Sequence, residues 1–219
     1  MSSLRAIFLA SLMPVTAAPL LAHPHIFVEA GVEVIFDSDG RPDALRISWE
    51  YDPFFSMLLV SDMGLDADFT GEISENERDA LDGFDMNWIE GYHGDVHVRQ
   101  GARDIALSEP VEWTSDYRDG QLRSTHLRKL LDPPDPRDEW VIAVYDPTYF
   151  TAYTVIDTPR ITGRDDCEAR IFEPDWDAAD ARLEAALEEL LGAGADIEAN
   201  FPAVGELFSD EVRLTCAGS

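Results

Sequence analysis

Apolar and polar residues alternate through residues 25–36, with the period of a β-strand that buries one face. The apolar side of this alternation contains Ile26, Val28, Ala30, Val32, Val34 and Phe36. A cluster of turn-forming residues follows at 37–42, and residues 44–51 form a second run with strand character. The pattern predicts a β-hairpin.

The spacing of apolar residues becomes helical from Phe54 to Met63, and residues 77–90 are predicted to be helical as well. A loop rich in acidic residues, 66–77, lies between these two segments. We therefore expect a helix–loop–helix insertion over residues 53–90.

The residue pattern in most of the remaining chain is typical of β-strands separated by turns. Strands are predicted at 92–98, 105–107, 111–113, 122–130, 140–145, 149–156, 169–172 and 212–214. Residues 174–191 form a predicted amphipathic helix, with an apolar stripe made of Leu183, Leu187, Leu190 and Leu191. The predicted fold class is α+β: an antiparallel, β-rich domain with an EF-hand-like insertion and a C-terminal amphipathic helix.

Residues 1–22 have the features of a secretory signal peptide. Arg5 provides the positive charge, an uncharged and mainly apolar run follows, and Ala22 suits the last position before cleavage. We expect cleavage after Ala22, a single domain over residues 23–219 and a periplasmic location. No later apolar run is long enough to span a bilayer, so we expect no membrane insertion after cleavage.

Charge and cysteine content narrow the classes of function. The chain has 16 basic and 44 acidic residues, for a formal net charge of −28. Such a surface repels nucleic acid and anionic membrane and attracts cations, although acidic surfaces also serve solubility alone. Cys167 and Cys216 are the two cysteines, and an even pair in an exported chain predicts a disulfide.

His23 and His25 form the first candidate metal site. Cleavage after Ala22 would give His23 a free α-amine beside its imidazole, with a second imidazole two residues later. Pro24 has no amide proton, which excludes the square-planar site that uses deprotonated amides of residues two and three. The donors suit nickel, cobalt, zinc or copper. Alternatively, the two histidines are incidental at an exposed strand end.

The loop 66–77 matches the spacing of a calcium-binding EF-hand loop. Its candidate ligands are Asp66, Asp68, Thr70, the carbonyl of Glu72, and Glu77 at position 12. Gly71 occupies the position where such loops bend sharply. The alternative is a degenerate loop that keeps this shape without an ion.

His93, Asp95 and His97 form a third candidate metal site. On a strand over 92–98, alternation would place these three side chains on one face. Two imidazoles, or one imidazole oriented by a carboxylate, are common elements of metal sites. A polar, solvent-facing strand surface explains the same pattern.

Several segments resemble the bacterial DUF1007 family. They are Ala-His-Pro-His-Ile-Phe-Val at 22–28, the segment with Trp49, Asp52 and Phe55-Ser56, Leu-Asp-Ala-Asp at 65–68 with Gly71 and Ile73-Ser74, Val-Tyr-Asp-Pro-Thr-Tyr-Phe at 144–150, and a cysteine near the C-terminus. Members are often described as uncharacterised periplasmic components of ABC-type transport systems, associated with nickel/cobalt and zinc transport. The resemblance implies metal handling and a membrane metal transporter as partner.

These observations lead to three hypotheses. The first is a non-enzymatic, periplasmic accessory protein that binds a transition metal for a transporter, with structural calcium in the 66–77 loop. The second is a calcium-stabilised interaction module without a transition metal. The third is an enzyme with an N-terminal-histidine copper site, which would need a further histidine among His93, His97 and His126. Sequence motifs of serine hydrolases, phosphate-binding loops and dinucleotide-binding folds are absent.

Overall fold

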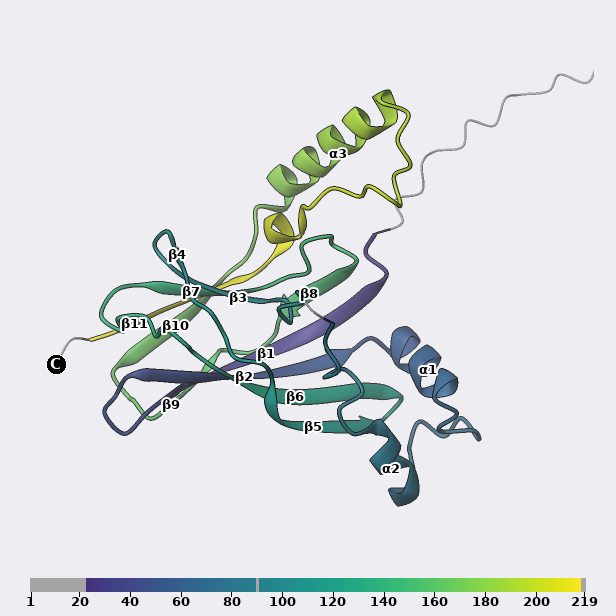
Figure 1. The fold of residues 1–219 in the computed structure, drawn as a ribbon, viewed down its shortest axis with the longest axis horizontal. Helices are drawn as coiled ribbons and strands as arrows, with labels where there is room; N and C mark the ends of the chain where they lie inside the picture. Colours follow the sequence, from purple (N-terminus) through teal and green to yellow (C-terminus); the bar gives the residue numbers. More distant parts are fainter. Residues whose placement is uncertain (1–22, 90, 218–219) are drawn as a thin grey trace, which may run out of the picture.

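The computed structural model describes residues 23–89 and 91–217, and the predicted signal peptide lies outside these residues. The described chain forms two β-sheets and three α-helices (Figure 1). The first sheet has the order β5 (Val111–Arg118), β6 (Gln121–Lys129), β2 (Pro42–Tyr51), β1 (Ile26–Phe36), β8 (Thr151–Val155), and β9 (Arg160–Thr162) also pairs with β1. The second has the order β10 (Cys167–Phe172), β11 (Glu211–Cys216), β7 (Trp140–Val144), β3 (Val96–Gln100), β4 (Arg103–Asp104).

The sheets are mainly antiparallel, as expected, but β1 pairs in parallel with both β8 and β9. This departure arises because the chain changes sheets between β7 and β8. The turn at 146–150 crosses from the second sheet and starts β8 beside the first residues of β1, where Ile26 is opposite Thr151.

One core lies between the two sheets. The predicted inner face of β1 is buried from Val28 to Phe36, and it shares a cluster with buried residues of β2, β3, β7 and β11. Trp140, Ile142 and Leu214 are fully buried members from the second sheet. The two-residue period of β1 therefore identified its core face correctly.

The predicted insertion contains two helices, α1 (Pro53–Asp62) and α2 (Glu75–Leu81), which lie at the corner of the molecule near β5 and β6 (Figure 1). The prediction of helix up to residue 90 was wrong. Helix α2 ends at Leu81 because Gly83 takes a left-handed conformation, with φ of 66°. Beyond it, residues 84–88 pack against the core instead, with Trp88 against His126.

The strand predictions at 92–98 and 105–107 also need correction, the strand predicted at 111–113 continues to Arg118, and two short strands, β4 and β9, were not predicted. Strand β3 begins at Val96 and not at Tyr92, because Gly94 and Asp95 both have positive φ. Residues 105–107 contribute an isolated bridge at Leu107, opposite Leu130, and no strand. The short strand β9 carries no signal of its own in the sequence, since its three residues are ordered by pairing with β1.

The C-terminal amphipathic helix is α3 (Trp176–Gly192), which projects away from the sheets (Figure 1). It belongs to an arm, residues 173–210, that leaves β10, forms α3, returns through a loop and the short 3-10 helix η1 (Gly205–Phe208), and enters β11. The arm has its own apolar cluster, built on Leu183, Leu187 and Phe208. Leu191, predicted on the same stripe, is 51% exposed.

The predicted disulfide between Cys167 and Cys216 is present. It joins residues that are directly opposite on β10 and β11, at the end of this strand pair away from the arm, which leaves and re-enters beside Phe172 and Glu211. A disulfide is consistent with an extracellular or periplasmic location. Within the residues that the structure describes, no helix has the length and apolar character needed to cross a bilayer.

Candidate metal centre

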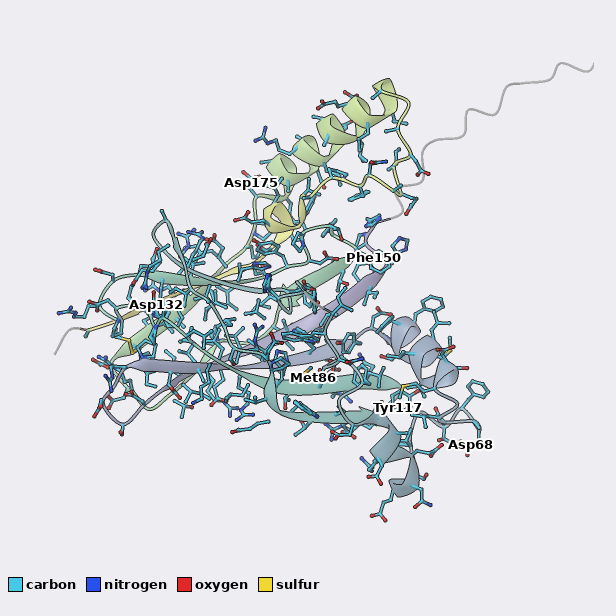
Figure 2. The ribbon with its side chains drawn as sticks, in the orientation of Figure 1. Asp68, Met86, Tyr117, Asp132, Phe150 and Asp175 are labelled. Carbon is cyan, nitrogen blue, oxygen red and sulfur yellow. A yellow bond between two sulfur atoms is a disulfide. The ribbon has the colours of Figure 1, made fainter. Side chains whose placement is uncertain are left out.

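The first residues of the described chain are anchored by the turn at 146–150. The amide of His25 donates a hydrogen bond to the carbonyl of Phe150 (2.8 Å), and the Phe150 ring lies 4.7 Å from the His25 ring and 5.6 Å from the His23 ring, centroid to centroid. The turn itself is organised by Asp146, whose carboxylate accepts hydrogen bonds from the amides of Thr148, Phe150 and Thr151. Figure 2 labels Phe150 at the end of the sheet where β1 begins.

The arm supplies the opposite wall of the site. A turn at 196–200 follows α3 and is held by the side chain of Asn200, which donates to the carbonyl of Asp196 (2.8 Å). This turn presents Glu198, and a little further on Phe201 stacks on the ring of His23 at 3.8 Å between centroids. Neither residue was predicted as part of a site, since nothing in the local pattern at 196–201 distinguishes this segment from any other acidic loop.

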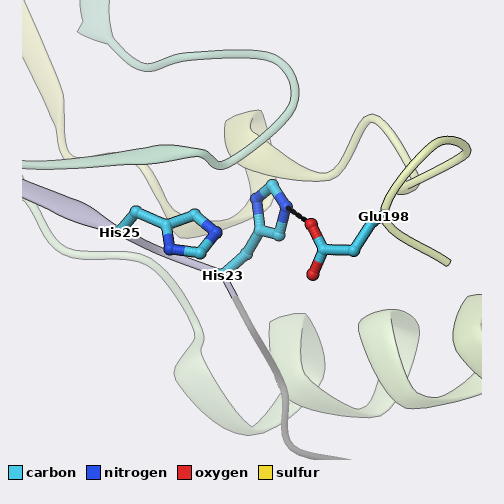
Figure 3. A group of neighbouring side chains, drawn as sticks. All are labelled: His23, His25 and Glu198. Carbon is cyan, nitrogen blue, oxygen red and sulfur yellow. Dashed lines mark ion pairs between the residues drawn. The ribbon is translucent and has the colours of Figure 1, made fainter.

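His23, His25 and Glu198 come together as a group of three potential metal ligands (Figure 3). One donor atom from each residue lies within 4.8 Å of the other two. Nε2 of His23 is 3.7 Å from a carboxylate oxygen of Glu198, and the two imidazole rings are 5.0 Å apart in an edge-to-face arrangement. The structure thus brings together both histidines of the first predicted site and adds a carboxylate.

The site combines a buried side and an open side. The His23 side chain is only 6% exposed, whereas that of Glu198 is 61% exposed. Nδ1 of His23 is buried without a hydrogen-bond partner in the structure, which is unusual for a ring nitrogen. Two imidazoles and one carboxylate are a donor set that zinc, nickel, cobalt and copper accept, and the set leaves coordination positions free. The residues present therefore fit a transition-metal ion.

The predicted calcium loop has its oxygen donors close together. Oγ1 of Thr70 lies 3.0 Å from Oδ1 of Asp66, 3.4 Å from Oδ1 of Asp68 and 3.4 Å from the carbonyl oxygen of Glu72. Asp66 is buried, and although burial opposes the effect, the amides of Gly71 and Thr70 hold its pKa below the usual range. Figure 2 shows Asp68 at the outer end of this loop.

Glu77, the predicted twelfth-position ligand, has a different partner. Its Oε2 accepts hydrogen bonds from the hydroxyl of Ser74 (2.6 Å) and the amide of Ser74 (2.8 Å), which lower the pKa of its carboxyl. This is the capping-box arrangement of a helix N-terminus. The prediction of an EF-hand-like insertion is therefore not confirmed: oxygens of Asp66, Asp68, Thr70 and Glu72 lie close together, but the Glu77 carboxylate belongs to a helix cap.

The third predicted site is not assembled. His93 is exposed and lies before the strand, where its carbonyl accepts a hydrogen bond from Arg128. Asp95 points into the interior, and its Oδ2 accepts hydrogen bonds from Tyr92 (2.9 Å) and Tyr153 (2.8 Å). Burial raises the pKa of Asp95 to about 6. The three residues do not share a strand face, because the backbone at Gly94 and Asp95 has positive φ.

His97, the last residue of that set, is half-buried against Tyr145. Its Nε2–H donates to the carbonyl of Tyr145 (3.1 Å), and the two rings stack at 3.8 Å. Burial lowers the pKa of His97. His126 is fully buried next to Trp49 and Trp88, and burial lowers its pKa to about 3. Both histidines therefore pack as neutral rings within the fold.

The fold and the site define a two-sheet α+β domain with a three-residue cluster of metal-binding type at its N-terminal strand. A sequence model of the family described as "Protein of unknown function (DUF1007)" matches residues 7–216, nearly the whole chain. The chain belongs to the DUF1007 family, as the resemblance indicated. The comparison with curated proteins found no match.

Proposed function

We propose that this protein is a periplasmic, non-enzymatic accessory protein that binds a transition-metal ion through His23 and His25 and passes it to a membrane metal transporter. The observation that carries this proposal is the convergence of the two imidazoles with Glu198. The family association with nickel/cobalt and zinc transport, inferred from the resemblance, and the strongly acidic composition support it.

The openness of the site suits a carrier. Only two imidazoles and one carboxylate contribute, and the carboxylate and His25 are exposed, so a receiving protein can approach the ion directly. Structural zinc sites, by contrast, are closed by four protein ligands. If the signal peptide is removed after Ala22, the α-amine of His23 adds a nitrogen donor, and the exposure of His25 and Glu198 still leaves the ion accessible to a receiving protein.

The copper-enzyme hypothesis is less well supported by the arrangement of histidines. It needs the imidazole of His93, His97 or His126 beside His23, and the group found among the described residues contains none of these three. His97 stacks on Tyr145, and His126 lies between two tryptophans. We therefore favour metal binding without catalysis.

Calorimetry tests the metal site. The exported and processed protein, with its N-terminus established by mass measurement, should bind one equivalent of at least one of Ni²⁺, Co²⁺, Zn²⁺ and Cu²⁺. The double variant His23→Ala/His25→Ala should lose this binding because it removes both imidazoles. His93→Ala is the control, since that side chain is exposed and outside the group. Binding that survives the double substitution would refute the proposal.

We propose further that calcium occupies the 66–77 loop and has a structural role. The four oxygens of Asp66, Asp68, Thr70 and Glu72 already converge, and hard oxygen donors at this spacing suit Ca²⁺. Leu65, Ile73 and Leu81, in or beside the loop and α2, are buried in the main core. An ion in the loop would therefore stabilise the packing of both helices on the first sheet.

Thermal or urea unfolding tests the calcium proposal. With an affinity typical of extracellular calcium modules, 10 mM Ca²⁺ should stabilise the fold by about 2 kcal/mol. Asp68→Asn should abolish this gain with little effect on the calcium-free protein, because Asp68 is exposed and its hydrogen bond from the Thr70 hydroxyl is long, at 3.4 Å. Asp62→Asn, an exposed acid at the end of α1, should keep the gain. If Ca²⁺ stabilises the unmodified protein and both variants equally, the 66–77 loop is not the calcium site.

A further inference from the structure

The arm meets the N-terminal strand at the metal centre through one short segment. We define the strap as residues 193–204, the loop between α3 and η1. It contributes Glu198 to the ligand group and Phe201 to the stack on His23. The metal centre is therefore built from two segments far apart in the sequence: the residues just before β1 and a loop of the C-terminal arm.

The part of the arm that follows the strap is firmly seated. The amide of Gly205 donates to the carbonyl of Pro147 (3.1 Å), Phe208 stacks on Tyr149 at 4.3 Å, and Asp210 accepts a hydrogen bond from the amide of Val155 (2.8 Å). Both flanking strands, β10 and β11, are fixed in the second sheet and joined by the disulfide. Movement of the seated segment would require breaking several of these contacts.

The strap is held more weakly. Its apolar residues Ile197, Phe201 and Val204 pack into the small cluster of the arm and not into the main core. Its polar contact with the N-terminal strand is the 3.7 Å ion pair between His23 and Glu198, which is longer than a hydrogen bond. An ion pair with one largely exposed partner contributes little to stability. Direct coordination of one ion by both side chains would join the strap to β1 much more strongly.

We propose that the bound ion fastens the strap to the N-terminal strand, so that metal occupancy controls whether the strap is closed. This inference rests on the proposed function and adds regulation to the same site. In the loaded protein Glu198 bridges to the ion and the strap closes over His23. When a receiving protein removes the ion, the strap keeps its small apolar cluster, the stack of Phe201 on His23 and the weak ion pair, so it opens more readily than in the loaded protein. The conformation of the strap thus differs between the metal-bound and the metal-free protein.

Hydrogen exchange read by mass spectrometry tests the proposal, with Zn²⁺ as the probe because it is redox-inert. The processed, full-length protein is measured without metal and with free Zn²⁺ at about 100 times the dissociation constant that calorimetry gives. Exchange in peptides covering 193–204 should then slow by about 100-fold, because strap opening requires release of the ion. Peptides from β1 after Val28 should change little, since that strand is already buried in the core.

Two single substitutions separate the strap from the metal site itself. Glu198→Gln keeps the shape of the side chain and should retain zinc binding at the two imidazoles, with lower affinity, while losing the protection of the strap. Glu188→Gln, an exposed acid on α3 outside the group, should behave as the unmodified protein. Zinc binding without protection of 193–204, or equal protection in Glu198→Gln, would overturn the strap and leave the proposed function intact. Absence of zinc binding would overturn the strap, and absence of binding of all four metals would overturn the proposed function as well.

Discussion

Replacing Cys167 and Cys216 by alanine should lower the free energy of unfolding by about 4 kcal/mol. The disulfide closes a loop with a sequence separation of 49, and the loop contains the whole arm. Without the cross-link the unfolded chain gains the conformational freedom of that loop, which favours unfolding. Urea unfolding followed by circular dichroism measures the change. The slope against urea should increase as well, because an unfolded chain without the cross-link exposes more surface.

The folded state should lose order locally in the same variant. Strand β10 is the edge of the second sheet and pairs with β11 alone among the described strands. Hydrogen exchange of residues 167–172 should therefore rise more than that of β7, which is flanked on both sides. Chemical reduction of the unmodified protein is the matched control and should give the same midpoint as the double alanine variant. If the reduced protein or the double alanine variant has the same urea midpoint as the oxidised protein, the prediction is wrong.

The sequence predicted best those features that depend on local period or on residue type alone. Alternation in 25–36 identified the core face of β1, because a strand with one buried face repeats every two residues. The cysteine pair was correct because the chain has two cysteines, so one disulfide is possible. Helix α3 was correct in extent to within two residues at either end. Its apolar stripe was too wide, since Leu191 has no partner element to bury it.

Other features could not be read from the sequence because one pattern supports two structures. Ser74 and Glu77 suit a capping box as well as the end of a calcium loop, and the structure uses them as a cap. His93, Asp95 and His97 alternate as a strand face would, but Gly94 allows a left-handed backbone that ends the alternation. In each case the residue types are compatible with both structures, and the backbone conformation decides which one forms.

The metal centre shows the same limit at long range. His23 and His25 were visible because they are two residues apart in the sequence, and the structure places both just before β1. Glu198 was not, since it reaches them only after the arm has folded back, seated by Phe208 on Tyr149. The sequence contains 44 acidic residues, so no local signal could select this one. A ligand contributed by a distant loop is found from the fold alone.

Adding a methyl group at Gly205 should disturb the contact between η1 and the turn at 146–150. A Cβ atom at this position would overlap the carbonyl of Asp146, which belongs to the turn that holds Phe150 beside the two histidines. Because the obstacle is backbone, relief requires η1 to move away from the turn. Gly205→Ala should therefore lower the free energy of unfolding by about 3 kcal/mol, at the upper end of overpacking effects. Urea unfolding measures this loss.

The same displacement should reach the metal centre. Movement of η1 separates Phe208 from Tyr149 and shifts the strap that ends at Val204, so Glu198 moves relative to His23. Calorimetry with Zn²⁺ should then show weaker binding although both imidazoles remain. Gly192→Ala is the matched control, because this residue ends α3 with open space around it and should be neutral or stabilising by about 0.5 kcal/mol. If Gly205→Ala unfolds and binds zinc as the control does, η1 does not position the strap.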